Sequence, residues 1–86
     1  MDDETLIKYG YIIGSSYRVK TVKTLKDEVK IPTQIAKDCG IRTNHISKVL
    51  SELKSQDIVE CLNENAKKGR LYRLTDLGDE IADNLK

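Results

Sequence analysis

Residues 32–72 read PTQIAKDCGIRTNHISKVLSELKSQDIVECLNENAKKGRLY and hold two helical patterns, a glycine between them and a basic loop. Pro32 suits the first turn of a helix, where its missing backbone N–H costs nothing. The segment PTQIAKDC then buries Ile35 and stops at Gly40, which can take the left-handed conformation that ends helices. The pattern predicts a helix-turn-helix unit over about residues 32–56.

The second helix of this unit has one apolar and one polar face. Thr43 or Asn44 can cap it, and it continues to about Gln56. At about 100° per residue, the apolar side chains fall in one sector and small polar ones in the opposite sector. The apolar set is Ile46, Val49, Leu50 and Leu53, and the polar set is Asn44, Ser47, Lys48, Ser51 and Ser55.

A strand–loop–strand pattern follows the two helices. IVECL and RLYRL alternate apolar and polar residues, as half-buried strands do, and NENAKKG between them is rich in turn formers. These features predict a hairpin over about residues 58–74. Leu71 and Leu74 would not share one face of a strand, so the register around Tyr72 stays open.

Further helices are expected on both sides of this unit. Residues 4–13 mix helical and strand signals, and their many apolar residues favour a short helix that packs on something, such as a second subunit. Ser15 or Ser16 caps a helix to about residue 28, with an apolar stripe of Val19, Val22, Leu25 and Val29.

The C-terminal segment predicts one more helix, over about residues 76–85. Thr75 or Asp76 caps it, and its apolar stripe is Leu77, Ile81 and Leu85. We expect that one or both of this stripe and the N-terminal helix pair across a two-fold axis.

Length and composition favour one domain over residues 1–86 with a modest core. No apolar run is long enough to span a membrane. The acidic start of the chain is the wrong charge for a secretory signal, so a cytoplasmic location is expected. Cys39 and Cys61 form no CxxC pair and are expected to be free thiols.

Charge is distributed unevenly although the formal net charge is only +1. Residues 8–48 carry nine Lys/Arg against three acids, and residues 63–73 carry four against one. Both chain ends are acidic. A surface that binds phosphates needs local positive potential, which a small net charge does not exclude.

Three stretches together resemble the winged helix-turn-helix regulators, in particular the small prokaryotic and archaeal MarR-like and ArsR-like proteins. They are SSYRVKTVKTL, PTQIAKDCGIRTNHISKVLSELKSQDIVE and AKKGRLYRLTDLGDEI, over roughly residues 15–85. The resemblance implies an α+β, mainly helical fold with a three-helix core, a two-stranded wing and a C-terminal helix. It also implies a transcriptional regulator that acts as a homodimer on palindromic double-stranded DNA, but it implies no effector.

The polar face of the second helix carries the groups that would read DNA. Asn pairs with adenine, Lys donates to guanine or phosphate, and Ser serves either. At the helix N-terminus, backbone N–H groups and the helix dipole favour a phosphate. The expected contacts are Arg42, Thr43, Asn44, His45, Ser47, Lys48 and Ser51.

The loop around Gly69 is the second expected contact. Lys67, Lys68 and Arg70 form a basic cluster that would reach the minor groove or the flanking backbone. Weaker phosphate candidates are Arg18, Lys20, Lys23, Lys26 and Lys37. The alternatives without DNA contact are that the polar helix face is simply solvated and that the basic loop only makes the protein more soluble.

The main alternative function is a winged-helix protein-interaction module within a larger assembly, without direct DNA binding. It predicts an occluded or acidic helix face and scattered basic residues, and Glu52 favours it slightly. Catalysis, a cofactor and a metal are not expected. No spacing organises a nucleophile with a base, and His45 with Cys39 supplies fewer ligands than a zinc site takes.

Overall fold

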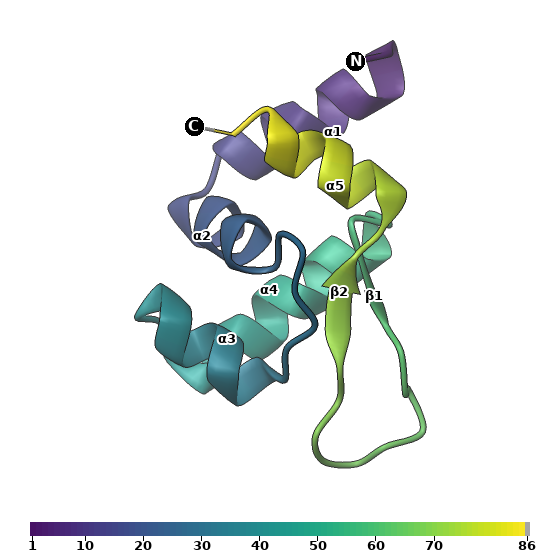
Figure 1. Cartoon of the computed structure of the whole chain (residues 1–86). Helices are drawn as coiled ribbons and strands as arrows, with labels where there is room; N and C mark the ends of the chain where they lie inside the picture. Colours follow the sequence, from purple (N-terminus) through teal and green to yellow (C-terminus); the bar gives the residue numbers. More distant parts are fainter. Residues whose placement is uncertain (86) are drawn as a thin grey trace.

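The computed structural model describes residues 1–85, which form five helices and a two-stranded antiparallel sheet (Figure 1). The elements in chain order are α1 (Asp3–Ile13), α2 (Ser16–Thr24), α3 (Pro32–Cys39), α4 (Thr43–Ser55), β1 (Val59–Cys61), β2 (Tyr72–Leu74) and α5 (Asp76–Asp83). The expected fold class, α+β and mainly helical with a two-stranded wing, is confirmed.

Helices α3 and α4 form the predicted helix-turn-helix unit. Gly40 ends α3 with φ at 67°, a conformation that glycine adopts without strain, and the next residue, Ile41, is buried. The expected cap by Thr43 or Asn44 is wrong. Arg42 is the N-cap residue, because its backbone is extended (φ −66°, ψ 146°), although its side chain makes no capping bond. The helix therefore begins at Thr43, one residue earlier than a cap at Thr43 would give.

Apolar side chains from all five helices and the sheet meet in one core. Its most deeply buried members include Ile12, Val22, Leu25, Ile35, Ile46, Leu50, Leu53, Ile58, Val59 and Ile81. In Figure 1, α1 and α5 lie together at one end of the molecule and the wing loop extends from the other. The apolar face of α4 points into this core, which leaves its polar face outward.

Helix α2 is shorter than predicted. The Ser15 hydroxyl caps it by accepting from Arg18 N at 3.4 Å, but the helix ends at Thr24. Asp27 has a positive φ of 59°, which turns the chain away from the helix axis. Val29 is therefore 48% exposed, and its expected place on the buried stripe is wrong.

The segment after α2 is anchored to the wing by a pairing that the sequence pattern did not indicate. Lys30 N donates to Tyr72 O at 3.0 Å, and Tyr72 N donates to Lys30 O at 2.9 Å. Lys30 thus extends the small sheet by one residue. It fixes the base of the wing beside the start of α3.

The register of the wing is settled by burial. Val59 pairs with Leu74, and Cys61 pairs with Tyr72, so Tyr72 and Leu74 share the inward face. Arg73 points outward, where its Nε lies 2.9 Å from a carboxylate oxygen of Glu60.

Helix α5 returns to the same core. Thr75 caps it, because its hydroxyl accepts from Gly78 N at 3.1 Å. Ile81 is fully buried in this chain, and Leu77 and Leu85 pack against the core. Ile81 therefore has no exposed area to contribute to the expected pairing with a second subunit, in which one or both of this stripe and the N-terminal helix take part.

Candidate nucleic-acid interface

The contact residues predicted at the start and on the polar face of α4 are exposed. All seven of them are exposed, whereas the four apolar residues on the opposite side of the helix are buried; the exposed seven are Arg42, Thr43, Asn44, His45, Ser47, Lys48 and Ser51. Hydrogen-bonding groups therefore cover the outer side of α4, without a large apolar side chain among them.

Two of these side chains also contact the protein itself. The Ser47 hydroxyl donates to Thr43 O at 3.1 Å within the helix, and its oxygen keeps lone pairs for an outside donor. The His45 ring lies against the Tyr17 ring of α2, with centroids 5.9 Å apart. His45 is thereby placed at the side of the face rather than at its centre.

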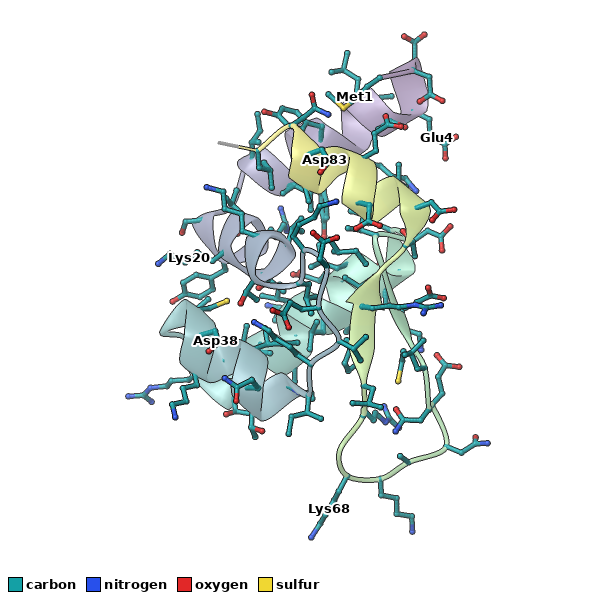
Figure 2. All side chains as sticks on the ribbon, in the orientation of Figure 1. Met1, Glu4, Lys20, Asp38, Lys68 and Asp83 are labelled. Atoms are coloured by element: carbon teal, nitrogen blue, oxygen red, sulfur yellow. The ribbon has the colours of Figure 1, made fainter. Side chains whose placement is uncertain are left out.

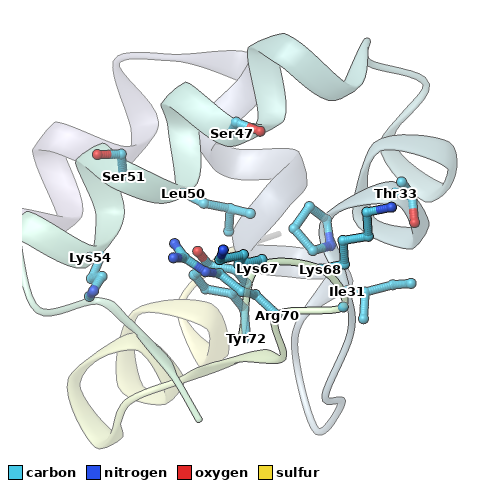
Figure 3. Close-up of a pocket in the computed structure, with 12 residues that line it drawn as sticks. Ile31, Thr33, Ser47, Leu50, Ser51, Lys54, Lys67, Lys68, Arg70 and Tyr72 are labelled. Carbon is cyan, nitrogen blue, oxygen red and sulfur yellow. The ribbon is translucent and has the colours of Figure 1, made fainter. Parts of the chain in front are cut away.

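A groove separates α4 from the wing and the start of α3 (Figure 3). Its cavity volume is about 580 Å³. Cationic side chains stand along it, hydroxyls face it from two helices, and apolar groups form its floor. The cations are Lys54, Lys67, Lys68 and Arg70; the hydroxyls belong to Thr33, Ser47 and Ser51; the apolar residues are Ile31, Pro32, Leu50 and Tyr72.

The groove brings the wing cluster together with two of the residues predicted at α4, although the two sets are separate in the sequence. The other five, Arg42, Thr43, Asn44, His45 and Lys48, do not line it. Ser47 and Ser51 from α4 face the same space as Lys67, Lys68 and Arg70 from the wing loop. Figure 3 shows Lys68 near Thr33, at the start of α3, and Lys54 farther along α4. A single extended partner could therefore touch both patches at once.

Lys54 and Thr33 also line this groove, although neither is among the contacts expected from the sequence. Lys54 follows Ser51 by three positions and Ser47 by seven, spacings that place all three on one side of a helix. That periodicity was the signal available for Lys54. Nothing in the sequence signalled Thr33, because only the packing of α3 beside the wing brings it to the groove.

The wing loop is braced by its own hydrogen bonds. Asn63 Nδ2 donates to Gly69 O at 3.2 Å, and Asn63 Oδ1 accepts from Leu71 N at 2.7 Å. Arg70 Nε donates to Ala66 O at 2.8 Å. Gly69 has φ at 65°, which lets the loop reverse between two exposed cations. The basic side chains therefore project from a loop with defined backbone positions.

Arg18, a weaker phosphate candidate, holds helices together instead. Its guanidinium carbon lies 3.8 Å from the centroid of the Tyr11 ring, and its Nη1 donates to Tyr11 O at 3.0 Å. Its Nη2 lies 4.0 Å from a carboxylate oxygen of Glu52. These contacts tie α1, α2 and α4 to one another, so Arg18 is already occupied within the protein.

Lys26 and Lys30 are likewise held by acidic partners. Lys26 Nζ lies 2.9 Å from Asp83 and 3.6 Å from Asp79, and the hydrogen bond to Asp83 raises the pKa of Lys26. Lys30 Nζ lies 2.7 Å from Asp38, which lowers the pKa of that carboxyl. The remaining candidates, Lys20, Lys23 and Lys37, have exposed side chains.

The two cysteines are free thiols, as expected. Cys39 is buried at the end of α3, and burial raises the pKa of its thiol, which disfavours the reactive thiolate. Among residues 1–85, no group of three or more His, Cys, Asp and Glu side chains is placed to hold a metal ion. Within the same residues, none of the helices has both the length and the apolar character to cross a membrane.

Comparison with known proteins gives a result at the level of structure only. No protein-family model matches the sequence, and no curated protein matches it. Solved winged-helix structures do match. The MarR family regulator SPO1453 from Silicibacter pomeroyi superimposes with a TM-score of 0.75 at 17% identity, over 96% of this chain and 62% of that one.

Two further structures are informative about the fold. ZitR from Lactococcus lactis, solved in complex with DNA, has a TM-score of 0.72 at 20% identity over 80% of this chain. The homodimeric winged helix-turn-helix DNA-binding domain of Mb0332 from Mycobacterium bovis has a TM-score of 0.72 at 20% identity, over 99% of this chain and 81% of that domain. The match covers only 48% of the ZitR chain, about half its length.

The chain therefore has the winged helix-turn-helix fold of the MarR-type transcriptional regulators. This confirms, for the fold, the resemblance that the sequence showed. The predicted contact residues are all exposed, and five of them, Ser47, Ser51, Lys67, Lys68 and Arg70, line one groove.

Proposed function

We propose that the protein is a sequence-specific, double-stranded DNA-binding transcriptional regulator. Helix α4 would enter the major groove, and the wing would lie on the minor groove or the flanking backbone. The observation that carries the proposal is the exposed polar face of α4 beside the cations of the wing, joined by one groove. The DNA complex of ZitR, a protein of the same fold, supports it.

The distribution of charge over the molecule supports the same orientation. Lys68 lies at the tip of the wing, whereas Glu4 and Asp83 lie at the opposite end, on α1 and α5 (Figure 2). A duplex is a dense line of negative charge, so it would be attracted to the wing end and repelled by the other. This polarity would orient the protein before any base is read.

A protein-interaction module is less well supported. That alternative requires the face of α4 to be occluded or acidic. The face is exposed, and Glu52, the one acidic residue of α4, lies 4.0 Å from Arg18 Nη2, which offsets its charge. The wing cations are also clustered at one groove instead of being scattered.

The proposed regulator acts as a homodimer on a palindromic site. Leu6, Ile7 and Ile13 of α1 are 53%, 73% and 53% exposed, which leaves apolar area for a second copy to cover. Two copies related by a two-fold axis would place two α4 helices in successive major grooves about 34 Å apart. The homodimeric state of the Mb0332 domain, which shares the fold, supports this arrangement.

The test is the salt dependence of DNA binding by a variant with Lys67, Lys68 and Arg70 replaced by alanine. Each lost phosphate contact should make the slope of log affinity against log salt shallower by roughly 0.9. We expect weaker binding and a slope that is shallower by up to about three times this amount, because three cations are removed. The measurement is titration of a labelled duplex over a range of salt concentrations.

The matched control is Arg73→Ala, compared with each single wing replacement. It removes one positive charge from the same hairpin, but at a strand position where Arg73 pairs with Glu60 away from the groove. We expect a smaller effect than that of Lys68→Ala. An unchanged slope in the triple variant would refute the role of the wing, and absence of binding by the unmodified protein would refute the function itself.

A further inference from the structure

We infer that the groove between α4 and the wing binds the sugar–phosphate backbone of one DNA strand, and that Glu64 competes with this backbone for Lys54. The inference rests on the proposed function. It adds a cation that the helix face and the wing cluster do not include, and an acidic residue that limits the affinity.

The first observation is an ion pair between a residue that lines the groove and the wing loop. Lys54 comes from the last turn of α4 and Glu64 from the wing loop, and the Lys54 ammonium contacts a carboxylate oxygen of Glu64. Lys54 also lines the groove beside Lys67 and Arg70. An anion entering the groove therefore meets a cation that already has an anionic partner.

The second observation is the chemistry of the groove walls. A nucleic-acid strand alternates anionic phosphates with less polar sugars. The groove offers cations and hydroxyls at its edges, and Leu50 and Tyr72 at its floor. Phosphate oxygens accept from ammonium, guanidinium and hydroxyl groups, while sugar carbons can pack on the apolar floor. A strand that runs between a helix in one groove of the duplex and a loop in the next would pass through this space, because α4 and the wing loop form its two walls.

The third observation is that Glu64 is ionised and replaceable. Its hydrogen bond with Lys54 and the nearby positive charge of Arg70 lower the pKa of Glu64, so the carboxylate stays charged near neutral pH. The side chains of Lys54 and Glu64 are 45% and 56% exposed. Exposed ion pairs are weak, so a phosphate can displace the carboxylate from Lys54 at small cost.

Two effects of Glu64 follow from this geometry. It holds Lys54 in a pair that must break before Lys54 reaches a phosphate, and its own charge repels the backbone. Glu64→Gln removes both effects while it keeps the size of the side chain. Lys54→Ala removes the cation for which they compete.

The experiment measures binding of a mixed-sequence DNA duplex by fluorescence anisotropy over a range of salt concentrations. We expect Glu64→Gln to bind about three- to tenfold more tightly, with a slope steeper by up to about 0.9. Lys54→Ala should bind more weakly, with a shallower slope. In the double variant, where Lys54 is already replaced by alanine, Glu64→Gln should increase the affinity less than it does in the unmodified protein.

The matched control is Glu60→Gln, which makes the same change of net charge on the same hairpin. Glu60 pairs with Arg73, which does not line the groove, whereas Glu64 pairs with Lys54, which does. If Glu60→Gln increased the affinity for the duplex as much as Glu64→Gln does, the effect would be one of total charge, and the inference would be overturned. Circular dichroism of each variant checks that the fold is retained.

The outcomes separate this inference from the proposed function. If the unmodified protein binds the duplex but Glu64→Gln and Lys54→Ala leave affinity and slope unchanged, the groove assignment fails and the DNA-binding function stands. If the unmodified protein does not bind the duplex, both fail. A titration with inorganic phosphate, followed by NMR shifts of the groove amides, tests for a free-anion site. Saturable phosphate binding without duplex binding would overturn the DNA assignment.

Discussion

At the scale of single residues, the structure separates cations that face solvent at the groove from cations that hold the fold. Arg18, Lys26 and Lys30 have ring, carbonyl or carboxylate partners within the chain. Lys67 and Lys68 project from the wing into the groove region. Charge counted along the sequence treats these residues alike, but only the second group lines the groove.

Arg18 gives the clearest prediction at this scale. Arg18→Lys keeps the charge but loses the planar group that stacks on Tyr11 and donates to its carbonyl. We expect the free energy of unfolding to fall by about 1–2 kcal/mol, measured by urea denaturation. Lys20→Ala on the exposed side of the same helix is the control, with a change within about 0.5 kcal/mol. Equal stability of Arg18→Lys and the unmodified protein would contradict this account.

At the scale of elements, α5 is fixed by a close approach of backbone to backbone. Gly78 in its first turn lies so near the Ile58 carbonyl that an added Cβ would overlap with the oxygen. The Thr75 hydroxyl donates to Asp57 O at 2.7 Å and accepts from Gly78 N, so the same turn is also held by hydrogen bonds. The start of α5 therefore cannot move away from the end of α4 without losing these bonds.

Two glycine replacements test this contact. Gly78→Ala should lower the free energy of unfolding by about 1–3 kcal/mol or more, because backbone rather than a flexible side chain must shift. Gly10→Ala, inside α1 with open space at the Cβ position, should raise it by about 0.5–1 kcal/mol. Thermal unfolding of both variants measures the difference. A Gly78→Ala variant as stable as Gly10→Ala would refute the proposed close approach.

At the scale of the whole molecule, the two ends differ in chemistry. The wing end carries exposed cations around the groove, and the other end carries acidic residues together with the exposed apolar side chains of α1. A homodimer formed through α1 would bury the apolar area and leave both wings free. The proposed DNA contact and the proposed dimer contact thus use different surfaces.

Ile7→Lys tests this arrangement. Ile7 is 73% exposed, so the replacement should leave the fold intact while a charge prevents burial of α1 at a subunit interface. We expect the unmodified protein to sediment as a dimer at micromolar concentration and Ile7→Lys to sediment as a monomer. Val29→Lys, at an exposed apolar residue outside α1, should remain a dimer. A monomeric unmodified protein would refute the dimer.

Much of the fold could be predicted because its signals are local. Proline at the first turn of α3, glycine after its last turn and the helical periodicity of α4 act within a few residues of one another. The two-stranded wing was predicted correctly, but the sequence left its register open. The register follows from the burial of Tyr72 and Leu74, which depends on helices distant in the sequence. The bridge between Lys30 and Tyr72 gave no pattern, because a single paired residue has no periodicity.

By itself, the sequence determined the order of the elements, the two faces of α4 and the basic character of the wing, since these follow from residue spacing and type. The tertiary structure alone decided which of the cations are available and which side chains share the groove. Lys26 meets Asp83, and Lys54 meets Glu64, only because packing brings separate elements together. Electrostatic interactions depend on distance in space, so no local pattern could reveal them.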